Sequence, residues 1–148
     1  MVDRTISDNY INNDYERINI HKKIDTIMTI DNLLELEAEL QDRFGPIPDD
    51  LYLYMYEKLM QRMARSYGIY KIIKGTDTIR FILSPEKNSS LNGLELFRLA
   101  YEAKIISLKE QMNLETRQKE IVFTLDIRGN ELKAFKTMCK YFNQIENV

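Results

Sequence analysis

The sequence predicts an α+β domain whose elements run in the order ααα-ββ-α-ββ-α. Apolar residues recur at helical spacing in three long segments of the first half, whereas short β-branched and aromatic runs occur in two pairs in the second half. The strict strand–helix alternation of a doubly wound parallel fold is missing. A chain of 148 residues is long enough to bury one core, so we expect a single domain over residues 1–148.

The first helix is expected from about Asn13 to Ile27. Its apolar residues approximate helical spacing among charged residues, which is the pattern of an amphipathic helix. These apolar residues are Tyr15, Ile18, Ile20, Ile24 and Ile27.

The second helix is expected from Asp31 to Phe44. Either Asp31 or Thr29 can cap its first amides, because both side chains carry an oxygen that accepts from a backbone N–H. Gly45 stands where helices commonly end with a residue in the left-handed conformation.

The third helix is expected to follow Pro46 and Pro48, which cannot continue the second helix, and to end at Tyr67 before Gly68. Acidic residues at its start suit the positive end of the helix dipole. Its apolar residues cover about half of its circumference at about 100° per residue, so this half should be core. They are Leu51, Tyr52, Met55, Tyr56, Leu59, Met60, Met63, Ala64 and Tyr67.

Two strand pairs and two helices are expected in the second half. Residues 69–74 and 78–83 flank Gly75-Thr76-Asp77, which is typical of an antiparallel hairpin. After a polar loop over residues 84–92 we expect a helix over 91–103, strands over 105–109 and 120–126, and a helix over 130–145. The last helix carries an apolar stripe of Leu132, Phe135, Cys139 and Phe142.

The residues that most enzyme and metal sites need are scarce, so we predict no catalytic, cofactor-binding or metal-binding residue in this chain. Its five glycines never form the phosphate-binding pattern G-x-x-x-x-G-K-[ST]. His21 is the only histidine and is expected on a helix surface, whereas zinc sites usually use several such ligands. Cys139 has no second cysteine to pair with and is expected to be a buried packing residue.

Composition and charge predict a protein of the bacterial cytoplasm. The net charge of −2 gives no global attraction to nucleic acid or anionic lipid. No apolar run approaches the roughly 20 residues that span a bilayer, and the first thirty residues resemble neither a signal peptide nor a transit peptide. The single cysteine suits a reducing compartment.

The second helix has an acidic face that is a candidate docking surface. Seven acids and one base, Arg43, stand between residues 31 and 50. Such a face is typical of a solvated helix, and the alternative is a docking strip for an arginine- or lysine-rich partner. A narrow apolar stripe is formed by Leu33, Leu36, Leu40 and Phe44. Four acids lie opposite this stripe and are therefore expected to be available to a partner: Asp31, Glu35, Glu39 and Asp42.

A basic segment follows over residues 58–80 and suggests an alternative function as an accessory DNA-binding module. Because Lys58 and Arg62 fall on or near the apolar half of the third helix, structural charge pairing is favoured over direct nucleic-acid binding. The bases outnumber Glu57 and Asp77 and are Lys58, Arg62, Arg65, Lys71, Lys74 and Arg80.

The segment Glu-Leu-Gln-Asp-Arg-Phe-Gly-Pro-Ile-Pro at residues 39–48 carries a family resemblance. Together with the acidic leucine-rich helix before it and the ending Tyr67-Gly68-Ile69 after it, this segment resembles the C-terminal domain of bacterial transcription-repair coupling factors. Upstream, Asn9-Tyr10-Ile11, Arg17-Ile18 and Lys23-Ile24 also match that family. The similarity is specific over residues 9–83 and weaker beyond Pro85.

The resemblance implies the C-terminal regulatory domain of a large ATP-driven DNA translocase, which displaces stalled RNA polymerase and recruits nucleotide-excision repair. Its helicase domains, with bound ATP and Mg²⁺, would lie outside this chain, and residues 1–8 would be a linker remnant or added sequence. The parent would bind RNA polymerase, UvrA and DNA, and no membrane.

In that family, the domain packs on the N-terminal module that binds UvrA, and hides that surface until the motor engages polymerase. Acidic positions before the Asp-Arg-Phe-Gly motif contribute to the contact, which implies partner-binding roles for Glu39 and Asp42. Glu35 is added to them from the helix geometry.

Overall fold

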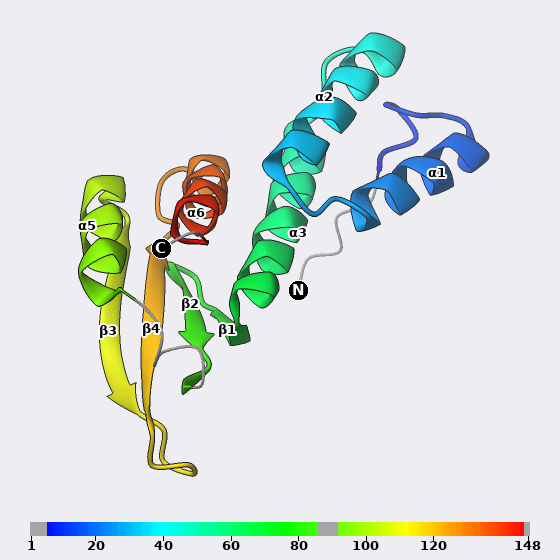
Figure 1. The fold of residues 1–148 in the computed structure, drawn as a ribbon. Helices are drawn as coiled ribbons and strands as arrows, with labels where there is room; N and C mark the ends of the chain where they lie inside the picture. Colours follow the sequence, from blue (N-terminus) through cyan, green and yellow to red (C-terminus); the bar gives the residue numbers. More distant parts are fainter. Residues whose placement is uncertain (1–5, 86–91, 147–148) are drawn as a thin grey trace. The chain divides into compact units, whose positions relative to one another are not determined.

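The computed structural model describes residues 6–85 and 92–146 and has the predicted α+β fold, with its helices and strands in the predicted order (Figure 1). Contacts divide the chain into two compact units, Met1–Arg62 and Met63–Val148. The expected single domain over residues 1–148 stays a prediction. Three predicted features lie partly outside the described residues. The parts outside are residues 1–5 of the linker remnant, most of the loop over 84–92, and the start of the following helix at residue 91.

Three helices build the first unit: α1 (Asp14–Asp25), α2 (Ile30–Phe44) and most of α3 (Asp49–Tyr67). Of the two possible caps of α2, Thr29 is the one used, because its side chain accepts from the backbone N–H of Asn32. Gly45 ends α2 with φ 85° and ψ −164°. This region is open essentially to glycine alone, and it differs in ψ from the expected left-handed helical conformation.

The core of the first unit is mainly aliphatic. It includes the leucines of the α2 stripe and most of the predicted apolar half of α3, of which Tyr52 and Met63 are only partly buried. The predicted apolar stripe of α1 is wrong in two places, because Tyr15 and Ile18 are 71% and 54% exposed whereas Ile20 and Ile24 are buried. The reason is the helical period: at about 100° per residue, Ile18 lies about 160° around the helix from Ile20.

A four-stranded antiparallel sheet organises the second unit, with the strand order β1-β2-β4-β3. The strands are β1 (Ile69–Lys74), β2 (Thr78–Leu83), β3 (Ile106–Met112) and β4 (Lys119–Asp126). The β3–β4 pairing runs to Met112 and Lys119, so this hairpin is longer than predicted. Its polar outer end lacks the apolar alternation that would have marked it as strand.

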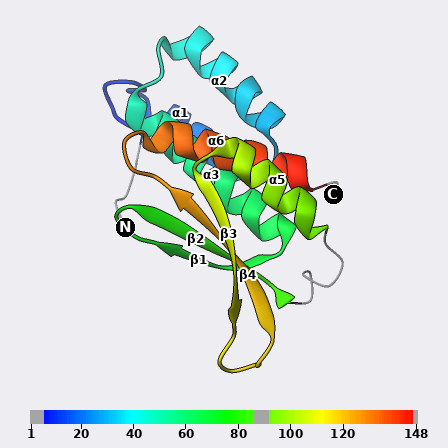
Figure 2. The same ribbon diagram turned by 90° about the vertical axis from the view of Figure 1, so that its left-hand side faces the viewer.

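Helices α5 (Gly93–Ala103) and α6 (Glu131–Ile145) lie over one face of the sheet (Figure 2). Aromatic rings join the two layers, because the ring centroid of Phe142 lies 5.6 Å from that of Phe81 and 6.3 Å from that of Phe123. Cys139 is buried beside them, as predicted, and burial raises the pKa of its thiol to about 12. The Tyr141 hydroxyl donates to the Leu96 carbonyl at 2.8 Å and ties α6 to α5.

Replacing Phe142 by alanine should lower the free energy of unfolding of this unit by about 3–5 kcal/mol, because it leaves a cavity between the helices and the sheet. Urea unfolding followed by circular dichroism measures the change. Phe97→Ala is the matched control, since Phe97 is 53% exposed on α5 and its removal should cost far less. Equal losses of unfolding free energy in the two variants would show that the aromatic layer does not stabilise the core.

Candidate partner-binding surface

The acidic face of α2 is set by the burial of its leucines. Leu33, Leu36 and Leu40 are buried, so the helix turns its opposite side to solvent. Five residues fall within about 100° of one another on this side. We call them the outer face of α2, and they are Asp31, Leu34, Glu35, Ala38 and Asp42, all of which are exposed.

Glu39 is engaged within the chain, and its predicted role in binding a partner stays a prediction. The Lys23 ammonium donates to both carboxylate oxygens of Glu39 at 2.8 Å, and Arg43 Nη1 donates to one of them at 2.8 Å. Arg43 also reaches Glu16 at 2.6 Å, which links α1 to α2. Sequence spacing within α2 cannot reveal these partners, because Lys23 lies 16 residues away on α1.

These contacts fix the charge state of Glu39. The hydrogen bond from Lys23, followed by the one from Arg43, holds the pKa of the Glu39 carboxyl below its ordinary value. The side chain of Glu39 is 31% exposed, so solvent screens the ion pair and its contribution to stability is modest. Glu39 therefore acts first as a brace between α1 and α2.

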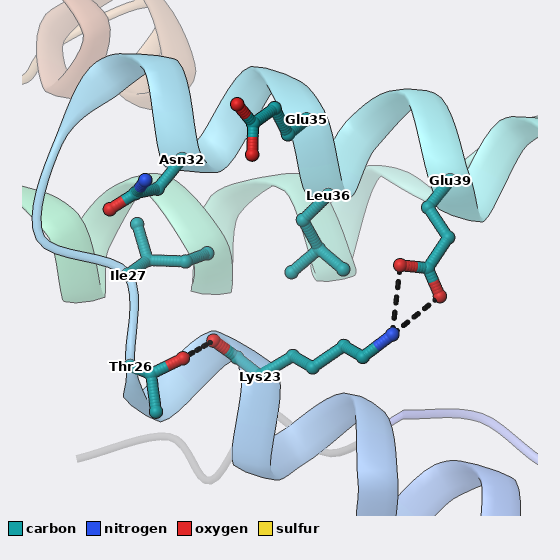
Figure 3. Close-up of a pocket in the computed structure, with 7 residues that line it drawn as sticks. All are labelled: Lys23, Thr26, Ile27, Asn32, Glu35, Leu36 and Glu39. Carbon is teal, nitrogen blue, oxygen red and sulfur yellow. Dashed lines mark hydrogen bonds and ion pairs between the residues drawn. The ribbon is translucent and has the colours of Figure 1, made fainter.

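A hollow of about 290 Å³ lies beside this brace, where the end of α1 faces α2 (Figure 3). Its apolar part is formed by Ile27 and Leu36, and Glu35 lies at its rim. Glu35 makes no hydrogen bond or ion pair with any residue that the structure describes, and the same holds for Asp42. The full lining is Lys23, Thr26, Ile27, Asn32, Glu35, Leu36 and Glu39. This combination suits the aliphatic stem and charged end of a lysine or arginine side chain.

Two features of this surface were not predicted. Leu34 is 48% exposed beside Glu35, and Ala38 lies at the centre of the outer face. Leu34 could have been recognised from its position outside the leucine stripe, at about 100° from Leu33. Together they give the acidic surface a small apolar centre.

The bases of the predicted 58–80 patch are divided between the two units, and four of them have partners within the chain. Arg62 donates to the carbonyls of Ile24 and Ile27 at 2.5 and 3.2 Å, which confirms its structural role. Arg65 donates to the Tyr70 carbonyl at 2.9 Å. Lys58 and Lys74 lie over the rings of Tyr54 and Phe135.

Among the described residues, the other candidates, His21 and a metal-binding cluster, form no recognisable active or metal site. The ring centroid of His21 lies 5.8 Å from that of Tyr54, with the two rings nearly perpendicular. Within residues 6–85 and 92–146, no three His, Cys, Asp or Glu side chains are grouped so as to hold a metal ion. None of the helices in these ranges has the length and apolar character needed to cross a membrane.

The chain has an α+β fold. An antiparallel sheet is covered by helices on one face, and the second helix carries an acidic face. A family model of the TRCF domain matches residues 1–94, which is more than half of the chain, so the chain belongs to the TRCF domain family.

Known relatives agree with this assignment. The transcription-repair-coupling factor of Bacillus subtilis (strain 168) is 26% identical over 129 residues, which cover 86% of this chain and 10% of the relative. The protein of the same name from Staphylococcus epidermidis is 30% identical over 89 residues, or 60% of this chain and 8% of the relative. The chain thus spans about a tenth of the length of these relatives.

The fold also matches a solved structure. The crystal structure of the C-terminal domain of transcription-repair coupling factor superposes with a TM-score of 0.73 and 21% identity, covering 99% of this chain and 91% of that one. The resemblance seen in the sequence is thereby confirmed: in family and fold, the chain corresponds to this C-terminal domain.

Replacing Lys23 by alanine should raise the pKa of the Glu39 carboxyl toward its ordinary value, because the largest cause of its lowering is removed. A group with a lowered pKa in the folded state stabilises the fold above its unfolded pKa, and this contribution is lost as the pH falls through the folded pKa. The loss of stability on acidification should therefore be smaller in the variant, by about 0.2–1 kcal/mol.

Carboxyl carbon NMR titration of Glu39, with urea unfolding at several pH values, measures both effects. Lys22→Ala is the matched control, since Lys22 is exposed on the same turn of α1 and makes no contact with Glu39 among the described residues. A Glu39 pKa that responds equally to both substitutions would contradict the brace.

Proposed function

We propose that this chain is an autoinhibitory interaction domain of a transcription-repair coupling factor. The outer face of α2 binds an arginine- or lysine-rich surface of the parent protein's N-terminal module and masks the site where that module binds UvrA. The contact opens when the motor engages stalled RNA polymerase. In this proposal, ATP hydrolysis and DNA translocation belong to parts of the parent outside this chain, in the bacterial cytoplasm.

The observation that carries the proposal is the unpaired charge of the outer face. Asp31, Glu35 and Asp42 are exposed and have no ion-pair partner in the described part of the chain, whereas Glu16 and Glu39 are already satisfied. Leu34 and Ala38 give the same face apolar area to bury. An acidic rim around a small apolar centre fits a basic partner, and charge complementarity then sets both specificity and association rate.

The structure divides the predicted partner-binding residues, Glu35, Glu39 and Asp42, into two groups. Glu35 and Asp42 contact the partner directly in the proposal, while Glu39 supports them by fixing α2 against α1. A partner arginine that enters the hollow beside Glu35 could also share Glu39 with Lys23. Masking requires the closed state to be only a few kcal/mol more stable than the open state. A ligand that binds only the open state can then shift the population toward it.

Reversing the charge of both unpaired acids, Glu35→Lys with Asp42→Lys, should weaken binding to the separated N-terminal module by tenfold or more, about 1.4 kcal/mol. Isothermal titration calorimetry measures the affinity, and circular dichroism checks the fold. UvrA should compete with the wild-type chain for the module.

The matched control is Glu115→Lys with Glu146→Lys, which makes the same change in net charge at exposed positions of the second unit. If both double variants weakened the affinity equally, the loss would be an effect of net charge rather than of the α2 surface. Unchanged binding in the α2 variant would show that this face is not the docking surface.

A further inference from the structure

The sheet has a second face, opposite α5 and α6, on which Arg80, Ser107 and Lys109 are exposed whereas Ile82, Val122 and Glu120 are buried. Side chains alternate along a strand, and Phe81 and Phe123 contact Phe142 of α6, so the residues next to them point to the opposite side. The register aligns Arg80 with Thr124, and Thr124 with Ser107, in one row across β2, β4 and β3. We call this side of β2, β4 and β3 the open face (Figure 2).

Cations without partners stand on the open face. Arg80 and Lys109 are exposed and make no ion pair or hydrogen bond with any residue in the described ranges. Arg17, Arg43 and Arg98, by contrast, are each bound by carboxylates. Neighbouring strands lie about 4.8 Å apart and a strand rises about 3.3 Å per residue, so Arg80 and Lys109, two strands apart and two residues out of register, are anchored about 12 Å from each other.

A hollow of about 250 Å³ lies at one end of the open face. Three hydroxyl side chains line it, from Thr78, Ser107 and Thr124, together with Lys104. Its one acid, Asp126, is already neutralised by Arg128, whose Nη2 lies 2.9 Å from the carboxylate. Hydroxyl donors and unpaired positive charge therefore converge here.

We propose that the open face binds the phosphate backbone of duplex DNA through Arg80, Lys104 and Lys109, with the hydroxyls of the hollow completing the phosphate contacts. Arginine, lysine, serine and threonine are the side chains that most often contact phosphate oxygens. Cations spread over about 12 Å suit a polyanion that repeats its charge along its length. This proposal does not depend on the acidic face of α2.

The chemistry of the open face favours a duplex over a single strand. The strands β2, β4 and β3 present aliphatic, hydroxyl, amide and charged side chains on this side, and no aromatic ring among the described residues. Single-strand binding usually relies on aromatic rings that stack on exposed bases. One ring flanks this side: Tyr70 on the edge strand β1 is 45% exposed, and its hydroxyl donates to Glu120 at 2.6 Å.

Two bases of the segment 58–80 lie on this side of the sheet: Lys71 on β1, which pairs with Ile82, and Arg80 on β2. Only Arg80 of that segment joins the open face in this proposal, and Lys104 and Lys109 come from a later part of the chain that pairing with β4 brings alongside. A net charge of −2 does not prevent such local attraction.

Fluorescence anisotropy with a labelled duplex of about 20 base pairs tests the proposal on the whole 148-residue chain. Three phosphate contacts predict a slope of about −2.7 in log K against log salt, so binding should weaken roughly 40-fold between about 50 and 200 mM NaCl. Arg80→Glu with Lys109→Glu should weaken binding at low salt by tenfold or more. Thr124→Val should weaken it by a smaller factor.

Lys136→Glu with Lys140→Glu is the matched control, because it makes the same charge change on α6, the layer on the other side of the sheet. Arg80→Gln with Lys109→Gln repeats the test with a milder substitution if the charge reversal disturbs the fold. The proposal is overturned if no duplex binds at low salt or if the α6 variant loses as much affinity. Equal or tighter binding of single-stranded DNA or of polyglutamate would also overturn it.

Discussion

The burial of the α2 leucines is the constraint on which the candidate site depends. Leu33, Leu36 and Leu40 can all be buried in only one rotation of the helix about its axis, and this rotation decides which acids face solvent. It turns Glu39 toward Lys23 on α1 and leaves Glu35 and Asp42 outside. One apolar contact therefore separates the acids of a single helix into a structural brace and a docking surface.

The sequence predicted the local features of the fold well, because each has a local cause. Thr29, Gly45 and the two prolines after it set the ends of α2 and the start of α3 without reference to the rest of the chain. The hairpin around Gly75 was recognisable for the same reason. The family resemblance through residues 39–48 likewise rests on the chemistry of one helix end and the next helix start.

What the sequence did not predict depends on contacts between distant segments. The strand order β1-β2-β4-β3 requires β2 to pair with β4 across α5 and β3, and no local pattern specifies this pairing. The Lys23–Glu39 contact joins two helices, so spacing within α2 could not reveal it. Lys109 and Arg80 lie on the same side of the sheet only because of its register.

Each unit presents a charged surface of its own, and the two have opposite sign. The acidic outer face of α2 belongs to the first unit, and the basic open face of the sheet to the second. The net charge of −2 conceals both, because acids and bases nearly cancel over the whole chain. A protein with such local charges can distinguish a basic protein surface from a nucleic-acid backbone.

The central claim is that the outer face of α2 meets the N-terminal module of the parent. Nitrogen-15 chemical-shift mapping of this chain during titration with that module tests it most directly. We expect the largest shifts on the amides of Leu34, Glu35, Ala38 and Asp42, with smaller shifts at Lys23. Shifts confined to the second unit, or spread evenly over both units, would contradict it.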